Sequence, residues 1–242
     1  MQPSWQERIY VACDFPTQHE LWGFLDRMER EVKGLKIGMQ LFYREGLPLV
    51  EKLAAQGYKL FLDLKLFDIP NTVRLTMKNM AQYPIEMVNV HAMGGRAMLE
   101  AAREGLEAAH GSHKPYLLGV TLLTSMDQES MRQNWLHDLP LPKMIQHLSQ
   151  LVWQSGLDGV VCSPWEAKEI KSYCSPEFLT VTPGIRPAGI SQDDQKRSAT
   201  PREARQLGAD YLVVGRPITM ATDPLVAYHT ILEQFKGGQE DE

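Results

Sequence analysis

The chain of 242 residues alternates eight times between a short apolar run and a segment with helical spacing. Runs of near-continuous apolar character are typical of parallel strands that helices cover on both faces. Eight strand–helix units in about 240 residues predict an α/β fold, a closed (β/α)8 or TIM barrel that forms a single domain. The expected strands are residues 8–14, 34–38, 59–67, 85–92, 116–123, 159–163, 178–182 and 211–214.

An open, doubly wound sheet is the alternative arrangement of the same units. The pattern GxGxxG does not follow the first expected strand, which lowers the case for a dinucleotide-binding sheet. The hydrophobic content of 43% allows one sizeable core, so no second domain is required. Residues 237–242 are rich in glycine and acid, and we expect them to form a frayed tail.

The charge pattern argues against two classes of partner. The net charge is -5, and the 25 basic residues are scattered along the chain, so no nucleic acid or anionic membrane is expected as a partner. The start of the chain lacks the build of a signal peptide, and no apolar run approaches membrane-spanning length. The three cysteines show no metal-ligand spacing, which predicts reduced thiols in a cytoplasmic protein.

Three charged residues interrupt the third expected strand and the turn after it. A side-chain period of two places Asp63 and Lys65 on one face of this strand, and Asp68 follows in the loop. Buried ions are rare unless they are paired, so the pair predicts a polar cleft at the strand end. Two alternatives stay open, a structural ion pair of Asp63 with Lys65 and a helix cap by Asp68.

Polar residues also stand at the ends of other expected strands. The active site of a (β/α)8 barrel lies at the carboxyl ends of its strands and in the loops that follow. These positions therefore predict one site at a single rim of the barrel. They are Asp14, Lys36, Asp63, Lys65, Asp68, His91, Thr124, Ser125, Arg186, Gly215 and Arg216.

The last two strand–helix units predict a phosphate site. Residues 182–187 and 215–217 combine glycine, whose backbone can approach a ligand closely, with Arg186 and Arg216, whose guanidinium groups bind phosphate. Residues 188–200, which include Gln195, are long enough to close over a ligand as a lid. A plain surface loop is the alternative for that segment.

The run Asp63-x-Lys65-x-x-Asp68-Ile69-Pro70-x-Thr72 strongly resembles the signature of the orotidine 5′-phosphate decarboxylase family. The resemblance covers nearly the whole chain. Phe67 departs from it, because relatives often carry histidine at this position. Further blocks that resemble the family stand at residues 12–14, 35–38, 90–92, 123–125, 182–186 and 214–217.

The resemblance implies the conversion of orotidine 5′-monophosphate to UMP and CO2, without a cofactor and without a metal. It implies that Lys65 is the fixed cation and proton donor, that Asp63 lies beside the leaving carboxylate, and that Lys36 holds Asp63 and touches the ribose. It further implies a homodimer in which Asp68, Ile69 and Thr72 complete the neighbouring subunit's site.

The remaining implied roles concern the ribose, the base and the phosphate. Asp14 is expected to hydrogen-bond a ribose hydroxyl, and Thr124 is expected near the base or ribose. The phosphate is expected to be held by Arg186, Gln195, the Gly215 amide and Arg216. His91 receives no role, because a histidine at a strand end is as often a hydrogen-bonded rim residue as a catalyst.

Two rival functions stay open. The sugar-phosphate decarboxylases and synthases that resemble this family use Mg2+ and are expected to carry a glutamate ligand on strand two. This chain has Lys36 there, and an ammonium group repels Mg2+. The second rival is a nucleotide-binding regulatory barrel without catalysis. Such a protein is expected to have lost one of the four charged residues Lys36, Asp63, Lys65 and Asp68, and all four are present.

Overall fold

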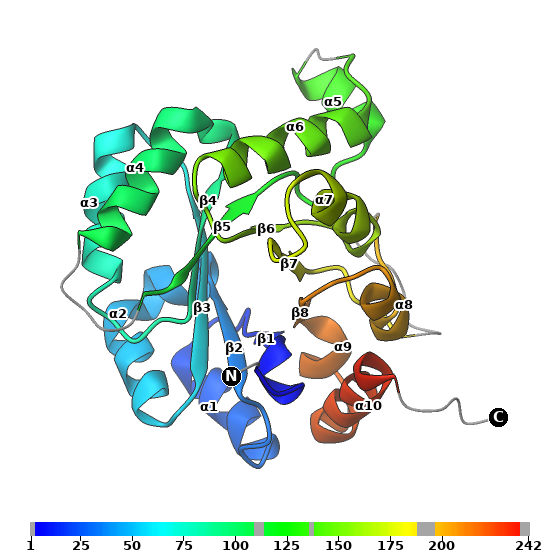
Figure 1. The fold of residues 1–242 in the computed structure, drawn as a ribbon. Helices are drawn as coiled ribbons and strands as arrows, with labels where there is room; N and C mark the ends of the chain where they lie inside the picture. Colours follow the sequence, from blue (N-terminus) through cyan, green and yellow to red (C-terminus); the bar gives the residue numbers. More distant parts are fainter. Residues whose placement is uncertain (1–2, 109–113, 136–137, 188–196, 238–242) are drawn as a thin grey trace.

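Eight parallel strands close into one barrel in the computed structural model, which describes residues 3–108, 114–135, 138–187 and 197–237 (Figure 1). Each strand pairs with the next along the chain, and the last pairs with the first. The predicted barrel is confirmed, and the open sheet is excluded. The strands are β1 (Ile9–Ala12), β2 (Gly34–Gly38), β3 (Lys59–Leu66), β4 (Met87–His91), β5 (Tyr116–Val120), β6 (Gly159–Val161), β7 (Leu179–Thr182) and β8 (Tyr211–Val214).

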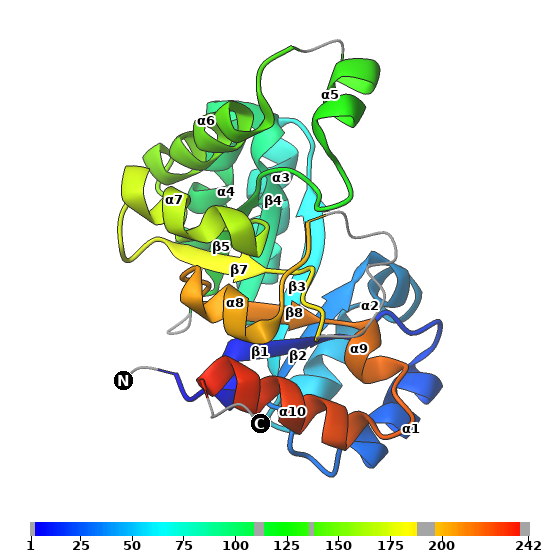
Figure 2. The same ribbon diagram turned by 90° about the vertical axis from the view of Figure 1, so that its right-hand side faces the viewer.

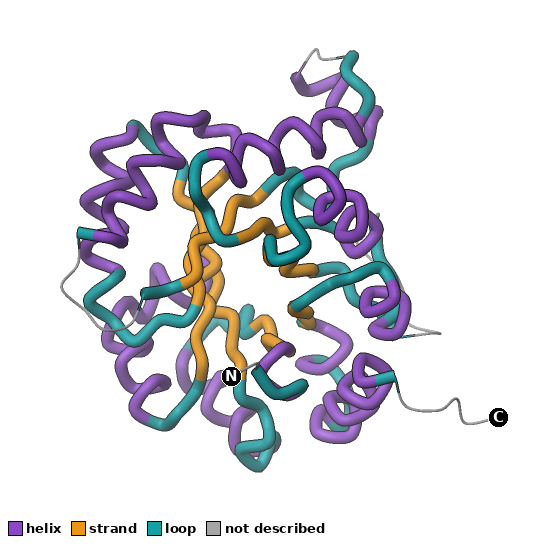
Figure 3. The backbone as a smooth tube through the Cα atoms, viewed as in Figure 1, coloured by secondary structure: helices purple, strands orange, loops and turns teal. Residues whose placement is uncertain are grey.

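Helices surround the strands on the outside of the barrel (Figure 3). Two of them were not predicted from the sequence, α5 in the long segment after β5 and the short α9 after β8. Both views show α5 at the periphery, beyond α6 and away from the barrel wall (Figures 1 and 2). The α-helices are α1 (Gln18–Arg27), α2 (Met39–Ala55), α3 (Pro70–Met80), α4 (Gly95–Glu107), α5 (Gln128–Trp135), α6 (Leu141–Gln154), α7 (Ala167–Tyr173), α8 (Pro201–Gln206), α9 (Arg216–Thr219) and α10 (Pro224–Lys236), and the 3-10 helices are η1 (Gln6–Arg8), η2 (Ala92–Gly94) and η3 (Pro164–Glu166).

The core has two layers because successive strand side chains point to opposite faces. Leu62 and Leu64 of β3 join the outer layer between strands and helices, whereas Phe61 points into the barrel. The ring of Tyr10 lies edge-on to that of Phe61, with centroids 6.1 Å apart. We call the inner cluster the barrel floor; it consists of Tyr10, Ala12, Phe61, Met87, Leu118, Val120, Val161, Val181, Tyr211 and Val213.

None of the helices in the described ranges has both the length and the apolar character needed to cross a membrane. The expected tail at 237–242 lies outside the described residues, except for Gly237.

Helices α3 and α4 pack with their backbones close together at Gly105. A Cβ atom at this position would lie 2.2 Å from the carbonyl oxygen of Arg74. Gly105→Ala is therefore expected to lower the free energy of unfolding by about 1 to 3 kcal/mol, because one helix must move. Gly23→Ala in α1 is the matched control, since nothing lies within 4 Å of its Cβ position. This control is expected to gain about 0.5 to 1 kcal/mol from helix propensity alone. Urea unfolding measures both values, and equal effects would contradict the close packing.

Candidate active site

A cavity of about 660 Å3 opens at the carboxyl ends of the strands, where the sequence predicted the site. Its volume lies in the range of small-molecule sites in proteins. Charged residues and apolar residues of the barrel floor share its wall. It is lined by Ala12, Asp14, Phe15, Lys36, Phe61, Asp63, Lys65, Val120, Leu122, Leu123, Thr124, Ser125, Val161, Cys162, Pro183, Gly184, Arg186, Val213, Gly215, Arg216, Thr219 and Met220.

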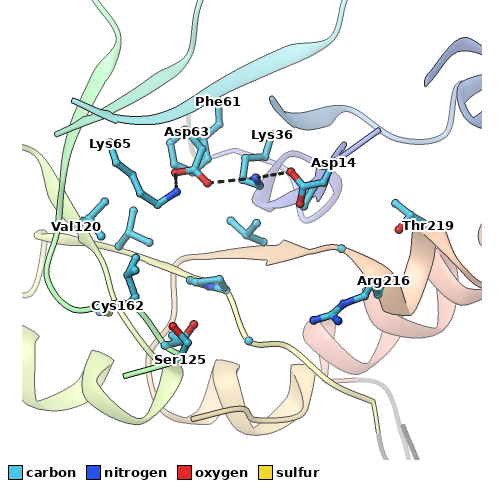
Figure 4. Close-up of a pocket in the computed structure, with 18 of the residues that line it drawn as sticks. Asp14, Lys36, Phe61, Asp63, Lys65, Val120, Ser125, Cys162, Arg216 and Thr219 are labelled. Carbon is cyan, nitrogen blue, oxygen red and sulfur yellow. Dashed lines mark hydrogen bonds and ion pairs between the residues drawn. The ribbon is translucent and has the colours of Figure 1, made fainter. Parts of the chain in front are cut away.

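Four charged side chains form an alternating row along one wall of the cavity (Figure 4). Lys36 Nζ lies 3.2 Å from Asp14 Oδ1 and 3.2 Å from Asp63 Oδ2. The other oxygen of Asp63, Oδ1, accepts a hydrogen bond of 2.6 Å from Lys65 Nζ. The strands β1, β2 and β3 are neighbours in the sheet. Their carboxyl ends therefore bring the four side chains into one line, although the residues are far apart in the sequence.

The row keeps its charges although much of it is buried. Burial opposes the charge of Lys36, but Asp63 and Asp14 outweigh burial and raise the pKa of Lys36. Burial likewise opposes the charge of Asp63, and Lys36 and Lys65 outweigh it, so that the pKa of Asp63 is lowered. Each charged side chain of the row therefore lies beside an opposite charge.

The ion pair of Asp63 and Lys65, left open as a structural alternative, does exist. Both side chains nevertheless line the cavity, and the side chain of Lys65 is 26% exposed. A purely structural pair gains nothing from facing an open cavity, whereas a reacting pair must face its ligand. The geometry therefore favours the functional interpretation.

The predicted phosphate-binding residues that are described lie in the same cavity. Gly184, Arg186, Gly215 and Arg216 all line it. Arg216 lies across the cavity from the charged row (Figure 4). Arg216 and the charged row therefore lie at opposite sides of one cavity.

The predicted lid is described only at its two ends. Ile185 and Ala199 form a parallel bridge, and the Arg186 amide donates to the carbonyl of Ala199 at 2.9 Å. Gln195 and the rest of 188–196 lie outside the described residues.

Thr124 and Ser125 line the cavity as predicted from their place after β5. The apolar part of the wall was not predicted, although several of its residues stand next to a predicted polar position or at a strand end. Cys162 is one of these, and burial raises the pKa of its thiol to about 12, so it is a neutral wall residue. The other apolar wall residues without a predicted role are Ala12, Phe15, Phe61, Val120, Leu122, Leu123, Val161, Pro183, Val213 and Met220.

Three predicted site residues do not line the cavity of their own chain. Asp68, Ile69 and Thr72 are exposed around the start of α3. Asp68 Oδ1 accepts a hydrogen bond of 2.7 Å from the Ile69 amide. Ile69 itself occupies the N-cap position without a side-chain cap, so the helix-cap alternative for Asp68 is wrong.

His91 ends β4 beside the cavity without lining it. Its Nδ1 accepts a hydrogen bond of 3.3 Å from the Met93 amide, and its ring stacks on Phe67 at 5.6 Å. Burial and the nearby charge of Lys65 lower the pKa of His91, which keeps the ring neutral at pH 7. The contacts are those of a hydrogen-bonded rim residue.

The cavity at the strand ends of this closed (β/α)8 barrel contains an alternating charged row and two arginines. This arrangement is typical of the active site of a barrel enzyme. The family model described as "Orotidine 5'-phosphate decarboxylase / HUMPS family" matches residues 7–231. The chain belongs to this family.

Relatives with assigned names agree with the family model over almost the full chain. The chain is 46% identical over 231 residues to the orotidine 5'-phosphate decarboxylase of Bacillus cytotoxicus, covering 95% of this chain and 97% of that protein. It is 47% identical over 233 residues to that of Geobacillus thermodenitrificans, covering 96% and 98%. The crystal structure of orotidine 5'-phosphate decarboxylase from Lactobacillus acidophilus superposes with a TM-score of 0.83 at 40% identity, covering 94% and 98%.

Proposed function

We propose that this protein is a single-function orotidine 5′-phosphate decarboxylase, which converts orotidine 5′-monophosphate to UMP and CO2. The observation that carries the proposal is the alternating row Asp14, Lys36, Asp63 and Lys65 in a nucleotide-sized cavity. The named relatives at 46–47% identity support the same reaction. The family resemblance implies that neither a metal nor a cofactor takes part.

Lys65 and Asp63 would act at the carbon that loses CO2. Decarboxylation leaves negative charge on a carbon without a conventional electron sink, so a fixed cation must stabilise it and a donor must protonate it. The Lys65 ammonium group meets both needs. Asp63 would face the departing carboxylate, and two like charges ~4 Å apart interact by about 4 kcal/mol at an effective dielectric of 20. This repulsion is larger in the substrate than in the product, which carries no carboxylate.

The other end of the cavity would bind the ribose and the phosphate. Asp14, whose side chain is 58% exposed, is available to accept a hydrogen bond from a ribose hydroxyl beside Lys36. Arg186, the Gly215 amide and Arg216 would hold the phosphate, together with Gln195 from outside the described residues. Thr124 would contact the base or the ribose. Phosphate binding far from the reacting carbon can then orient the pyrimidine against Lys65.

The site would be completed by a second copy of the chain. Asp68, Ile69 and Thr72 do not line their own cavity, and two large apolar side chains are exposed in this segment. Ile69 is 68% exposed and Phe67 is 62% exposed. Exposed apolar residues that lie together can form part of an interaction surface. A homodimer would cover them and bring Asp68 into the partner's charged row.

Two coarser properties accompany the proposed function. We place residues 1–242 in one domain, because the described strands all belong to one closed sheet. We place the protein in the cytoplasm, where Cys13, Cys162 and Cys174 would stay reduced, as they are in the structure.

The proposed function is tested by following the loss of orotidylate absorbance with purified protein in EDTA. Full turnover with the chelator present is expected, since the row needs no metal. The sugar-phosphate rival requires Mg2+ instead, and the described residues contain no cluster of three or more His, Cys, Asp or Glu side chains fit for a metal. Turnover that returns only with Mg2+ would contradict the proposal.

The regulatory rival gives a different result in the same experiment. A barrel without catalysis would bind UMP, measured by calorimetry, and leave orotidylate unchanged with or without Mg2+. The four charged residues that the family resemblance implies for catalysis, Lys36, Asp63, Lys65 and Asp68, are all present in this chain.

A further inference from the structure

A break in strand pairing lies where β3 carries the charged row. Phe61 and Leu62 pair in order with Met87 and Val88, but the next pair is Leu66 with Val90. Asp63, Leu64 and Lys65 therefore face a single residue of β4, Asn89. Bulges of this kind re-aim side chains and leave a backbone amide without its ladder partner.

Lys65 adopts an unusual backbone conformation within this break. Its φ is +50°, in the left-handed region that side chains other than glycine rarely adopt. Such a conformation persists only when its surroundings hold it. The described contacts identify the group that does so: the Lys65 amide donates a hydrogen bond of 2.7 Å to the side-chain Oδ1 of Asn89.

The other end of the same side chain holds Asp63. Asn89 Nδ2 donates to Asp63 Oδ1 at 2.7 Å, and this oxygen also accepts from Lys65 Nζ at 2.6 Å. The carboxylate is thereby turned so that its second oxygen, Oδ2, faces Lys36 at 3.2 Å. Asn89 is 1% exposed, so no water replaces either bond at low cost.

Only one orientation of the Asn89 amide fits these neighbours. Turning it over would place the amide hydrogens against the Lys65 N–H and the amide oxygen against the Asp63 carboxylate. The amide thus accepts at one end and donates at the other without carrying a charge.

We propose that Asn89 is a positioning residue that aligns the two reacting groups, by holding the left-handed backbone of Lys65 with one end of its amide and the carboxylate of Asp63 with the other. It contacts the row through Asp63 and the Lys65 amide, and it is not among the residues that line the cavity. This inference rests on the proposed function, because it concerns how the groups of that reaction are held.

The test compares Asn89→Leu, which removes both bonds at similar size, with Val88→Ala. Val88 precedes Asn89 on β4 and faces the outer core layer, so it controls for lost packing in the same strand. Asn89→Leu is expected to lower kcat about 100-fold, as misplacement by about 1 Å does, with UMP affinity within about threefold of the native value. Its crystal structure is expected to show Lys65 out of the left-handed region and its ammonium moved from Asp63.

Asn89→Asp separates the two bonds and keeps the test decisive if the leucine variant does not fold. In its ionised form the new carboxylate still accepts from the Lys65 amide, but it cannot donate to Asp63 and repels it, so the variant is measured above the pH at which the new group ionises. We expect Lys65 to keep its backbone conformation, Asp63 to turn away, and kcat to fall at least about tenfold.

Two results would overturn the inference. One is a kcat within about threefold of that of Val88→Ala for both Asn89 variants. The other is a loss of kcat in variants whose crystal structures show Lys65 and Asp63 unmoved. If the native protein decarboxylates nothing, the proposed function fails, and the crystal structures still decide whether Asn89 holds the pair.

Discussion

Lys65→Ala is expected to abolish decarboxylation while UMP still binds. In the proposed mechanism this variant loses both the cation that stabilises the carbanion and the group that protonates it, so kcat is expected to fall at least ~10⁴-fold. UMP carries no carboxylate at the reacting carbon, and Arg186 and Arg216, which we propose hold the phosphate, are unchanged. Orotidylate absorbance measures the loss of turnover, and calorimetry measures UMP binding.

Lys168→Ala is the matched control for this variant. Lys168 is an exposed lysine on α7, and it does not line the cavity. Its loss is expected to leave kcat unchanged, which separates a general effect of charge from the role of Lys65. Turnover by Lys65→Ala above about 1% of the native rate would contradict the role of Lys65 as cation and proton donor.

Mixing two inactive variants is expected to restore activity if the sites are shared between subunits. Asp68→Ala alone should lose at least about 100-fold in kcat, as the loss of one fixed charge in a row does. In a heterodimer with Lys65→Ala, one site lacks both residues and the other has a full set. Random exchange makes half of the dimers mixed, and each mixed dimer has one full site out of two. About a quarter of native activity is therefore expected to return.

The control for this mixture uses two residues that belong to the same subunit's row. Lys36→Ala mixed with Lys65→Ala gives heterodimers in which each site lacks one lysine, so activity should not return. Recovery is measured after subunit exchange, with differently tagged chains to show that heterodimers have formed. Heterodimers of Lys65→Ala and Asp68→Ala that stay inactive would contradict the shared site.

The strands were predictable because buried parallel strands leave a plain signal in the sequence. Residues 211–214 were predicted as a strand and form β8 without any change of boundary. The strand predicted at residues 8–14 was too long, since β1 runs only from Ile9 to Ala12; its pairing with β8 ends at Val11 and its pairing with β2 ends at Ala12. Apolar pattern marks the buried run, whereas pairing decides where a strand ends.

The two helices that were not predicted leave no helical pattern of apolar residues in the sequence. Only Met131 is buried in α5, so this helix has no apolar stripe to recognise. Helix α9 has four residues and contains Pro217, which is too short for any helical period. Both follow strands on the side of the barrel where loops vary with function.

The charged residues of the site were predictable, but the way they are held was not. Strict alternation along β3 placed Asp63 beside Lys65, and the structure confirms their contact. The left-handed backbone of Lys65 and the clamp by Asn89 depend on a register break between two strands. Asn89 lies 24 residues from Lys65 in the chain, and no local pattern connects them.

The filled barrel floor decides how molecules pass through the site. Tyr10, Phe61 and Tyr211 occupy the interior beneath the charged row, so the cavity is a well with a solid base and not a channel. A nucleotide enters and both products leave through the same mouth. UMP that has not departed therefore stands in the path of the next substrate molecule. Product release through this mouth is therefore a step that every catalytic cycle must complete before the next substrate can bind.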